Sequence, residues 1–283
     1  MSLTLTATPL TAVPPVGARS DQGATKPLLL LGPSLGTSGP RLWAPIVEQL
    51  ADVAHLVAWD LPGHGASPAT TESFTVGDLA DAVAALADSW SDETGATARF
   101  HAGVSLGGAT SLEIGLRHPG AFDGLAVLCS GPKLGTPESW TERAALIRDK
   151  GTDAVVDRSR QRWFAPGFVD ANPQVAGALL DGLHAVDDES YARCCEALAS
   201  FDVRERLSEI TDPIVAIAGV DDAVAPPEMA EGIAAAAAQG RAVSLDGVAH
   251  LAPSEDPVRT AEALRALMTS ALPGTPASTQ ETR

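Results

Sequence analysis

The feature that most constrains the fold is a regular alternation between short apolar runs and amphipathic stretches. The apolar runs have the length and composition of buried strands and lie at 28–31, 55–59, 98–102, 124–129, 213–218 and 241–245. The stretches between them have apolar residues spaced by three and four, as in helices, and lie at 41–51, 75–90, 106–117, 227–238 and 255–270. This alternation predicts an α/β fold with a mostly parallel central sheet and helices on both faces.

One long segment lacks the alternation. Residues 133–207 have helical spacing throughout and contain no strand candidate. We therefore expect a helical cap at 133–207, inserted into a core made of residues 1–132 and 208–270. The cap should lie over the carboxyl edge of the sheet, where open α/β sheets bind ligands. The composition of residues 271–283 predicts a disordered tail.

Charge and cysteine content exclude several classes of protein. Thirty-six acidic and nineteen basic side chains give a net charge of −17, which repels phosphates and anionic lipids, so neither nucleic acid nor membrane is an expected partner. No apolar run approaches the roughly 20 residues that span a bilayer, and the N-terminus has no signal-peptide pattern. The three cysteines indicate neither a disulfide framework nor a zinc site. We expect a cytoplasmic protein without metal or cofactor, and the oligomeric state stays open.

Residues 103–107 have the form Gly-x-Ser-x-Gly between a predicted strand and a predicted helix. A sharp turn there would present the Ser105 hydroxyl above the sheet, at a helix N-terminus that favours negative charge. A serine nucleophile also needs a base and an acid that orients it. Asp222 follows the strand predicted at 213–218, with Asp221 as the less favoured acid, and His250 follows the strand predicted at 241–245. The alternatives are an ordinary helix N-cap for Ser105 and a solvated loop histidine for His250.

Acyl transfer further requires N–H groups that stabilise the oxyanion. The backbone N–H of Leu106 is one candidate, because it follows the nucleophile directly. The second should come from the loop after the first central strand, where Pro33 has no N–H. We expect Ser34 to supply it, or failing that Leu35.

Together these residues resemble the α/β-hydrolases and, among them, the 3-oxoadipate enol-lactonases. The shared order is Ser, Asp, His, and the more specific likenesses are Pro-Ser-Leu-Gly-Thr at 33–37, Gly-Thr-Pro-Glu-Ser-Trp at 135–140, Arg-Trp-Phe at 162–164 and Tyr-Ala-Arg-Cys-Cys at 191–195. The resemblance implies a carboxylic ester hydrolase that opens 3-oxoadipate enol-lactone in aromatic catabolism. Ser105 would be the nucleophile, His250 the base, and Asp222 its orienting partner.

The chain departs from this family at three places. Pro33 replaces an asparagine, Leu61-Pro62 replaces a pair that includes arginine, and Pro132-Lys133 replaces Ala-Arg. The lactone carries a carboxylate, so a cation should meet it.

Lys133 is the first candidate for that cation, before Arg162 and Arg143. Trp140 and Trp163 are candidates for the pocket wall, and packing within the cap is the alternative for both. Three other functions stay open: hydrolysis of another lactone or ester, C–C bond hydrolysis, and ligand binding without turnover.

Overall fold

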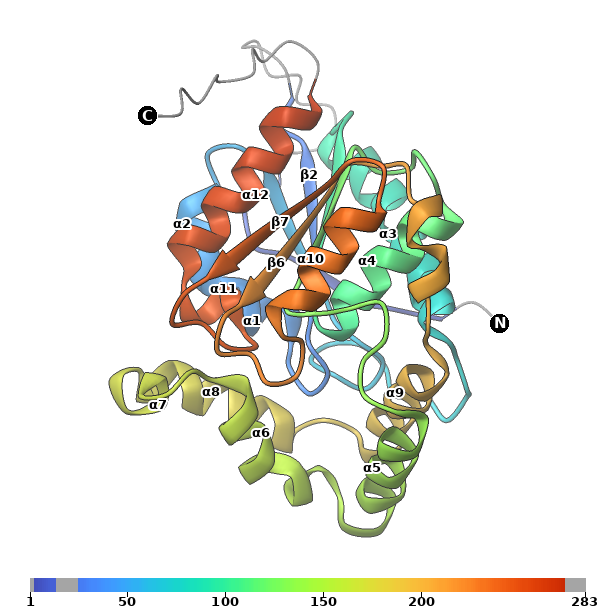
Figure 1. The fold of residues 1–283 in the computed structure, drawn as a ribbon, viewed down its shortest axis with the longest axis vertical. Helices are drawn as coiled ribbons and strands as arrows, with labels where there is room; N and C mark the ends of the chain where they lie inside the picture. Colours follow the sequence, from blue (N-terminus) through green and yellow to red (C-terminus); the bar gives the residue numbers. More distant parts are fainter. Residues whose placement is uncertain (1–2, 14–24, 273–283) are drawn as a thin grey trace.

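The computed structural model describes residues 3–13 and 25–272, and in them it contains a seven-stranded sheet (Figure 1). The strand order is β1-β3-β2-β4-β5-β6-β7, and every neighbouring pair is parallel except β1 with β3. The strands are β1 (Ala7–Pro9), β2 (Leu28–Gly32), β3 (His55–Trp59), β4 (Arg99–Val104), β5 (Gly124–Leu128), β6 (Ile214–Gly219) and β7 (Gly240–Leu245). The predicted α/β class with a mostly parallel sheet is confirmed.

Helices cover both faces of this sheet, as Figure 1 shows. One face carries α1 (Gly39–Trp43), α2 (Val47–Leu50), α11 (Ala252–Glu255) and α12 (Pro257–Ala271), and the other carries α3 (Val76–Thr94), α4 (Leu106–Arg117) and α10 (Pro227–Ala236). The central strands are buried on both faces, which explains their unbroken apolar sequences. The sheet and its helices thus form the main hydrophobic core.

Proline explains two differences from the predicted helices. The helix expected at 41–51 is instead α1, a short 3₁₀ turn η1 (Ala44–Ile46) and α2, with Pro45 inside the turn. The helix expected at 255–270 divides into α11 and α12, and Pro257 begins the second. Proline lacks an N–H and suits the first turn of a helix rather than its interior. Strand β1 was not predicted, because three half-buried residues give no periodic signal.

The segment between β5 and β6 is helical, and Figure 1 shows most of it beneath the carboxyl edge of the sheet. Its last turn lies beside α4 and α10 instead. The elements of the segment are α5 (Pro137–Lys150), η2 (Thr152–Val155), α6 (Val156–Trp163), α7 (Phe168–Ala171), α8 (Pro173–His184), α9 (Asp188–Ser200) and η3 (Arg204–Glu209). We call residues 133–207 the cap.

The ends of the chain add two observations. Ala271, placed in the predicted tail, is the last residue of α12, and residues 273–283 of that tail lie outside the described residues. Among the helices that the structure describes, none is long and apolar enough to cross a membrane.

Candidate active site

Ser105 occupies a sharp turn between β4 and α4. Its backbone has φ 54° and ψ −112°, an unusual conformation for a residue with a side chain. The turn requires its flanking glycines, because a Cβ on Gly103 would collide with the carbonyl of Gly107. The Ser105 hydroxyl makes no capping hydrogen bond to α4, which argues against the N-cap alternative. The hydroxyl is therefore held at the sheet edge in a strained turn without a structural bond of its own.

His250 and Asp222 form a buried pair at the same edge. The Nδ1 atom of His250 lies 2.8 Å from Oδ2 of Asp222, and each side chain is at most 4% exposed. The other carboxylate oxygen accepts the N–H groups of Val224 and Ala225 at 2.7 and 3.1 Å. Asp221 is exposed, so the structure brings Asp222 and not Asp221 to the histidine. A buried His250 with a fixed carboxylate partner also disagrees with a solvated loop histidine.

The turn that carries Ser105 (the elbow) and the loop that carries His250 (the histidine loop) are joined through the residues that follow β5. The hydroxyl of Ser130 donates to the carbonyl of Ser105 at 2.7 Å. The neighbouring Cys129 directs its thiol to the carbonyl of Ala249 at 3.4 Å, one residue before His250. Ser105, Asp222 and His250 follow β4, β6 and β7, whose carboxyl ends lie at one edge. In the described part of the chain, the Ser105 hydroxyl forms no hydrogen bond to His250.

The loop after β2 changes the prediction for the second oxyanion donor. The N–H of Ser34 already donates to Oγ1 of Thr37 at 3.1 Å, so it is not available to an oxyanion. The N–H of Leu35 has no acceptor among the described residues, and the Leu35 side chain is buried. Leu35 therefore replaces Ser34 as the candidate donor, beside the N–H of Leu106.

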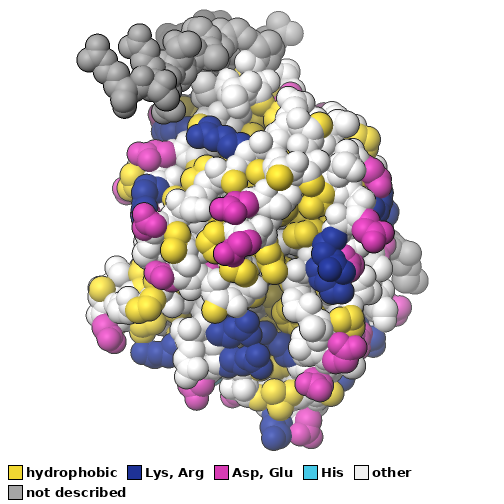
Figure 2. Space-filling model, in the orientation of Figure 1, with side chains coloured by type: hydrophobic (Ala, Val, Ile, Leu, Met, Phe, Trp, Pro, Cys, Tyr) yellow, Lys and Arg dark blue, Asp and Glu magenta, His cyan; other side chains and the backbone are white. Residues whose placement is uncertain are grey.

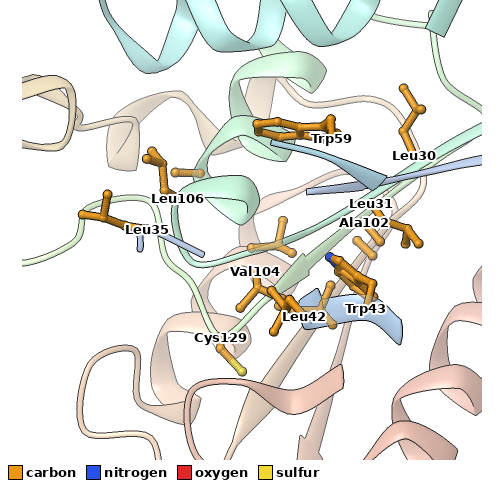
Figure 3. Close-up of a cluster of buried hydrophobic side chains, with 14 of the residues drawn as sticks. Leu30, Leu31, Leu35, Leu42, Trp43, Trp59, Ala102, Val104, Leu106 and Cys129 are labelled. Atoms are coloured by element: carbon orange, nitrogen blue, oxygen red, sulfur yellow. The ribbon is translucent and has the colours of Figure 1, made fainter. Parts of the chain in front are cut away.

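Two contacts hold the loop at the elbow. The N–H of Gly107 donates to the carbonyl of Pro33 at 3.0 Å, which joins the loop to the first turn of α4. The side chains of Leu35 and Leu106 both belong to the buried cluster in Figure 3. Apolar burial thus anchors the two residues whose backbone N–H groups are the oxyanion candidates.

The side chain of His64 is hydrogen-bonded to the same loop, the loop after β2. Its Nε2 accepts the N–H of Gly36 at 3.1 Å, and its Nδ1 lies 2.8 Å from the carbonyl of Pro62. This pair of bonds requires a neutral ring protonated at Nδ1. Burial lowers the pKa of His64 to about 4, so the ring stays neutral at pH 7. Nothing in the sequence around His64 indicates Gly36 as its partner, so this contact could not be predicted.

Glu255 holds the histidine loop and was not predicted. One carboxylate oxygen accepts the N–H groups of Ala249 and Leu251 at 3.0 and 3.1 Å, on either side of His250. The other accepts the N–H of Ala165, a cap residue, at 2.6 Å. Burial raises the pKa of Glu255 and outweighs the backbone bonds that lower it. From sequence alone, an acid five residues after a histidine looks like a solvated surface charge.

The candidate substrate-binding residues of the cap fall into two groups. Lys133 forms an ion pair with Asp202 at 3.1 Å, so the structure does not leave it free for a substrate and corrects its first place among the cations. Trp140 is partly buried and donates from Nε1 to the carbonyl of Leu134. This bond indicates packing within the cap, the alternative stated for Trp140.

Trp163 and Arg162, at the end of α6, lie close to the histidine loop. The carbonyl of Trp163 accepts the N–H of His250 at 3.2 Å. A Cβ on Gly36 would lie 3.3 Å from the Trp163 ring, so this ring covers the oxyanion loop. Burial lowers the pKa of the Arg162 guanidinium, and the Asp222 carboxylate acts in the opposite direction as a smaller effect. The structure therefore brings Trp163 and Arg162 to the site, and leaves Lys133 and Trp140 in structural bonds.

Metal ligands are a separate question. Within residues 3–13 and 25–272, no group of three His, Cys, Asp or Glu side chains has the arrangement of a metal site. The geometry that is present consists of a serine at an elbow, a histidine–carboxylate pair and two candidate N–H donors. That combination is the arrangement of a serine hydrolase.

The fold and this arrangement define the class of protein, and comparison with known proteins agrees. The model of the alpha/beta hydrolase family matches residues 28–263, and the chain belongs to this family.

Its relatives include 3-oxoadipate enol-lactonase 2 of Acinetobacter baylyi, which is 33% identical over 201 residues, 71% of this chain and 73% of that protein. Another is a protein of Pseudomonas syringae pv. syringae whose name suggests carbamate hydrolysis; it is 29% identical over 88% of this chain and 96% of that protein.

Solved structures give the same result. The enol-lactonase of Burkholderia xenovorans LB400 superposes with a TM-score of 0.82 and 28% identity, covering 94% of this chain and 96% of that one. A hydrolase of Pseudomonas aeruginosa PA01 gives a TM-score of 0.82 and 26% identity, covering 93% and 94%. The chain is thus an alpha/beta hydrolase related to enol-lactonases, and hydrolysis is its supported class of activity.

Proposed function

We propose that this protein is a serine hydrolase that opens a lactone ring, with 3-oxoadipate enol-lactone as its substrate. The observation that carries the proposal is the buried His250–Asp222 pair at the same sheet edge as the strained Ser105 elbow. The 33% identity to an enol-lactonase supports the choice of substrate. A cytoplasmic location fits this activity and stays a prediction.

In this proposal Ser105 attacks the lactone carbonyl while His250 Nε2 accepts the hydroxyl proton. The bond between His250 Nδ1 and Asp222 fixes the tautomer that this step needs. The N–H groups of Leu35 and Leu106 would stabilise the tetrahedral oxyanion. Collapse of that intermediate breaks the ring C–O bond, and the leaving enolate takes the proton held by His250 and becomes a ketone, which leaves His250 neutral again. Water activated by His250 then releases the second carboxylate and regenerates Ser105.

A second candidate is hydrolysis of another lactone or carboxylic ester by the same residues. Leu61 and Pro62 favour it, because the resemblance to the enol-lactonase family implies an arginine at this turn and this chain has none. Leu61 is fully buried, and the Pro62 carbonyl is bonded to His64. If an arginine at this turn meets the substrate in those relatives, the chain needs a cation from another element.

The test compares wild type with Ser105→Ala in an assay of ultraviolet absorbance loss by 3-oxoadipate enol-lactone. We expect rapid loss with wild type and a kcat reduced more than about 10³-fold in the variant, because triad members act as a unit. Equal melting temperatures would show that the variant folds.

Activity retained by Ser105→Ala would overturn the elbow assignment. Wild type that hydrolyses neutral esters but not the enol-lactone would favour the second candidate. A panel that includes a meta-cleavage product tests C–C hydrolysis. Ligand binding without any turnover would place the protein among non-enzymes.

A further inference from the structure

The two candidate oxyanion donors belong to peptide groups whose carbonyl ends are also held. The N–H of Leu35 shares a peptide group with the carbonyl of Ser34, and the N–H of Leu106 shares one with the carbonyl of Ser105. Both peptide groups are trans. In a trans peptide the C=O and N–H bonds point in opposite directions. A contact that fixes the carbonyl of such a peptide therefore also directs its N–H.

The Ser34 carbonyl accepts two hydrogen bonds from one residue. The hydroxyl of Thr37 donates to it at 2.8 Å, and the N–H of Thr37 donates to it at 3.0 Å. The same hydroxyl accepts the N–H of Ser34 at 3.1 Å, and the N–H of Gly36 is bonded to His64. Among residues 34–37, Leu35 is thus the one whose N–H has no acceptor in the described part of the chain. Thr37 fixes the Ser34–Leu35 peptide and leaves its N–H free.

The Ser105 carbonyl is held in the same way. The hydroxyl of Ser130 donates to it at 2.7 Å, and the N–H of Ala109 donates to it at 2.8 Å. Ser105 has a strained backbone, and its ψ of −112° sets the plane of the peptide that carries the Leu106 N–H. Strained conformations persist only where the surrounding structure fixes them. Because Ala109 already satisfies the carbonyl, the bond from Ser130 is an additional constraint on that plane.

Both hydroxyls lie in the interior of the protein. Thr37 is fully buried and Ser130 is 4% exposed, whereas Figure 2 shows, for one face, charged side chains spread over the outer surface of the core and the cap. A Cβ on Gly108 would lie 2.6 Å from the Cβ of Ser130, so Ser130 packs tightly against the first turn of α4. Hydrogen bonds away from water are electrostatically stronger, and a bond to the C=O of an amide polarises the amide toward donation. Each hydroxyl is therefore placed to orient and to strengthen one oxyanion donor.

We propose that Thr37 and Ser130 are positioning residues of the oxyanion hole. Each hydroxyl holds the carbonyl of one donor peptide and thereby aims the N–H of Leu35 or of Leu106 at the oxyanion. The inference rests on the proposed function, because it requires that Ser105 forms a tetrahedral intermediate. Both residues act through a peptide group and not on the substrate itself, so their contribution belongs to the transition state and not to substrate binding.

The experiment compares Ser130→Ala, Thr37→Val and the double variant with wild type on 4-nitrophenyl butyrate, a neutral ester that reports acyl transfer. The net contribution of one hydrogen bond predicts a fall in kcat of about 3- to 10-fold for each single variant. The double variant should lose about 10- to 100-fold, because the hydroxyls act on separate peptides. KM should stay within about twofold of wild type. Phenylboronic acid, which forms a tetrahedral adduct with a nucleophilic serine, should lose affinity by the same factors as kcat.

Two further variants distinguish this role from a purely structural one. Thr37→Ser keeps the hydroxyl and should retain kcat within about twofold of wild type. Thr260→Val is the matched control, because it removes a buried hydroxyl that donates to the carbonyl of Ala252 at 3.1 Å. The residue after Ala252 is Pro253, which has no N–H to direct. The melting temperature of Thr260→Val should fall like that of Ser130→Ala, while its kcat stays within about twofold of wild type.

A double-mutant cycle tests the action through the peptide group. Leu35→Pro removes the N–H that Thr37 directs, so the addition of Thr37→Val to Leu35→Pro should cause no further loss of kcat. Ser130 directs a different N–H, so Ser130→Ala should still lower kcat by about 3- to 10-fold in the Leu35→Pro background. A purely structural effect of Thr37→Val would instead multiply with the effect of Leu35→Pro.

Two outcomes overturn the inference. One is unchanged kcat and unchanged affinity for phenylboronic acid in Ser130→Ala and Thr37→Val. The other is a loss that Thr37→Ser does not restore and that Thr260→Val reproduces. Ser130→Ala leaves the Ser105 carbonyl bonded to Ala109, so the test does not depend on the stability of Thr37→Val. Failure of the proposed function gives a different result: wild type would neither hydrolyse the ester nor bind phenylboronic acid, and both the function and this inference would then be wrong.

Discussion

The sheet edge and the cap differ in how completely their polar groups are bonded. At the sheet edge, the Asp222 carboxylate has three hydrogen-bond partners, and the loop that carries Leu35 is bonded to Thr37, Gly107 and His64. In the cap, the Nε atom of Arg143 and the hydroxyls of Ser159 and Tyr191 are buried without a hydrogen-bond partner in the described structure. The comparison indicates that the candidate reacting groups are fixed by hydrogen bonds within the protein, whereas several polar groups of the cap are not.

The two regions meet at a small number of bonds around His250. Glu255 binds the backbone on both sides of His250 and also the N–H of Ala165 in the cap. The carbonyl of Trp163 accepts the N–H of His250 itself. The position of the base and the docking of α6 therefore depend on the same contacts, and three substitutions test this division of roles.

The largest effect is expected where a backbone donor of the sheet edge is removed. Leu35→Pro deletes the N–H that we assign to the oxyanion, and loss of one such donor costs about 10²- to 10³-fold in kcat. Leu35→Ala is the matched control, because it keeps the N–H and removes only apolar contacts. Steady-state kinetics on a neutral ester and the melting temperature separate the two effects. Equal kcat values for the two variants would exclude Leu35 as the donor.

Glu255→Gln tests the connection between the regions. The amide keeps one acceptor oxygen but directs an N–H₂ group toward one of the backbone N–H groups that the carboxylate now accepts. We expect kcat on the neutral ester to fall about 10-fold and the free energy of unfolding to fall by about 1–3 kcal/mol. The exposed Glu262→Gln on α12 provides the control for lost charge.

If Glu255 also holds the cap in place through the N–H of Ala165, Glu255→Gln should raise KM as well as lower kcat. An unchanged kcat would show that the two N–H bonds beside His250 do not position it. Chemical denaturation measures the loss of stability, and steady-state kinetics on a neutral ester measure kcat and KM separately.

The smallest effect at neutral pH is expected for His64→Gln. Burial lowers the pKa of His64 to about 4 in the folded state, against about 6.5 in the unfolded chain. Below pH 6.5 the unfolded state therefore binds more protons, and stability falls as the pH is lowered toward 4. Between pH 7 and pH 5 this loss is about 2 kcal/mol for His64. Glutamine does not titrate and can still accept the N–H of Gly36.

We expect the free energy of unfolding of His64→Gln to depend less steeply on pH than that of wild type, by about that amount. Denaturant titrations at pH 7 and pH 5 measure the difference. His101, whose pKa is lowered to about 3 by burial, retains its own pH dependence in both proteins. Identical slopes would show that His64 is not buried in the neutral form.

Local sequence was sufficient for the six parallel strands β2 to β7 and for the elbow, but not for the short strand β1. A buried parallel strand is apolar throughout, so runs such as Leu28–Leu31 identify themselves without any partner. The Gly-x-Ser-x-Gly turn is also local, because its glycines remove clashes within five residues. Asp222 and His250 could be predicted because strand order places the ends of β6 and β7 at one edge. The prolines that interrupt the predicted helices, Pro45 and Pro257, were visible in the sequence. The helical periodicity of the residues around them nevertheless led to the prediction of unbroken helices.

Only the tertiary structure decided which polar groups already have a hydrogen-bond or ion-pair partner within the protein. Ser34 and Leu35 are equivalent donors in the sequence, and the bond from Ser34 to Thr37 separates them. Lys133 and Arg143 are both cap cations, and Asp202 is close to only the first of these. Glu255 finds its partners in the cap and the histidine loop. The sequence by itself determined the fold class and the candidate reacting residues, because short-range periodicity, turn sterics and the order of the strands encode them. The availability of a donor or a charge depends on neighbours that are distant in sequence, so the folded chain alone determines it.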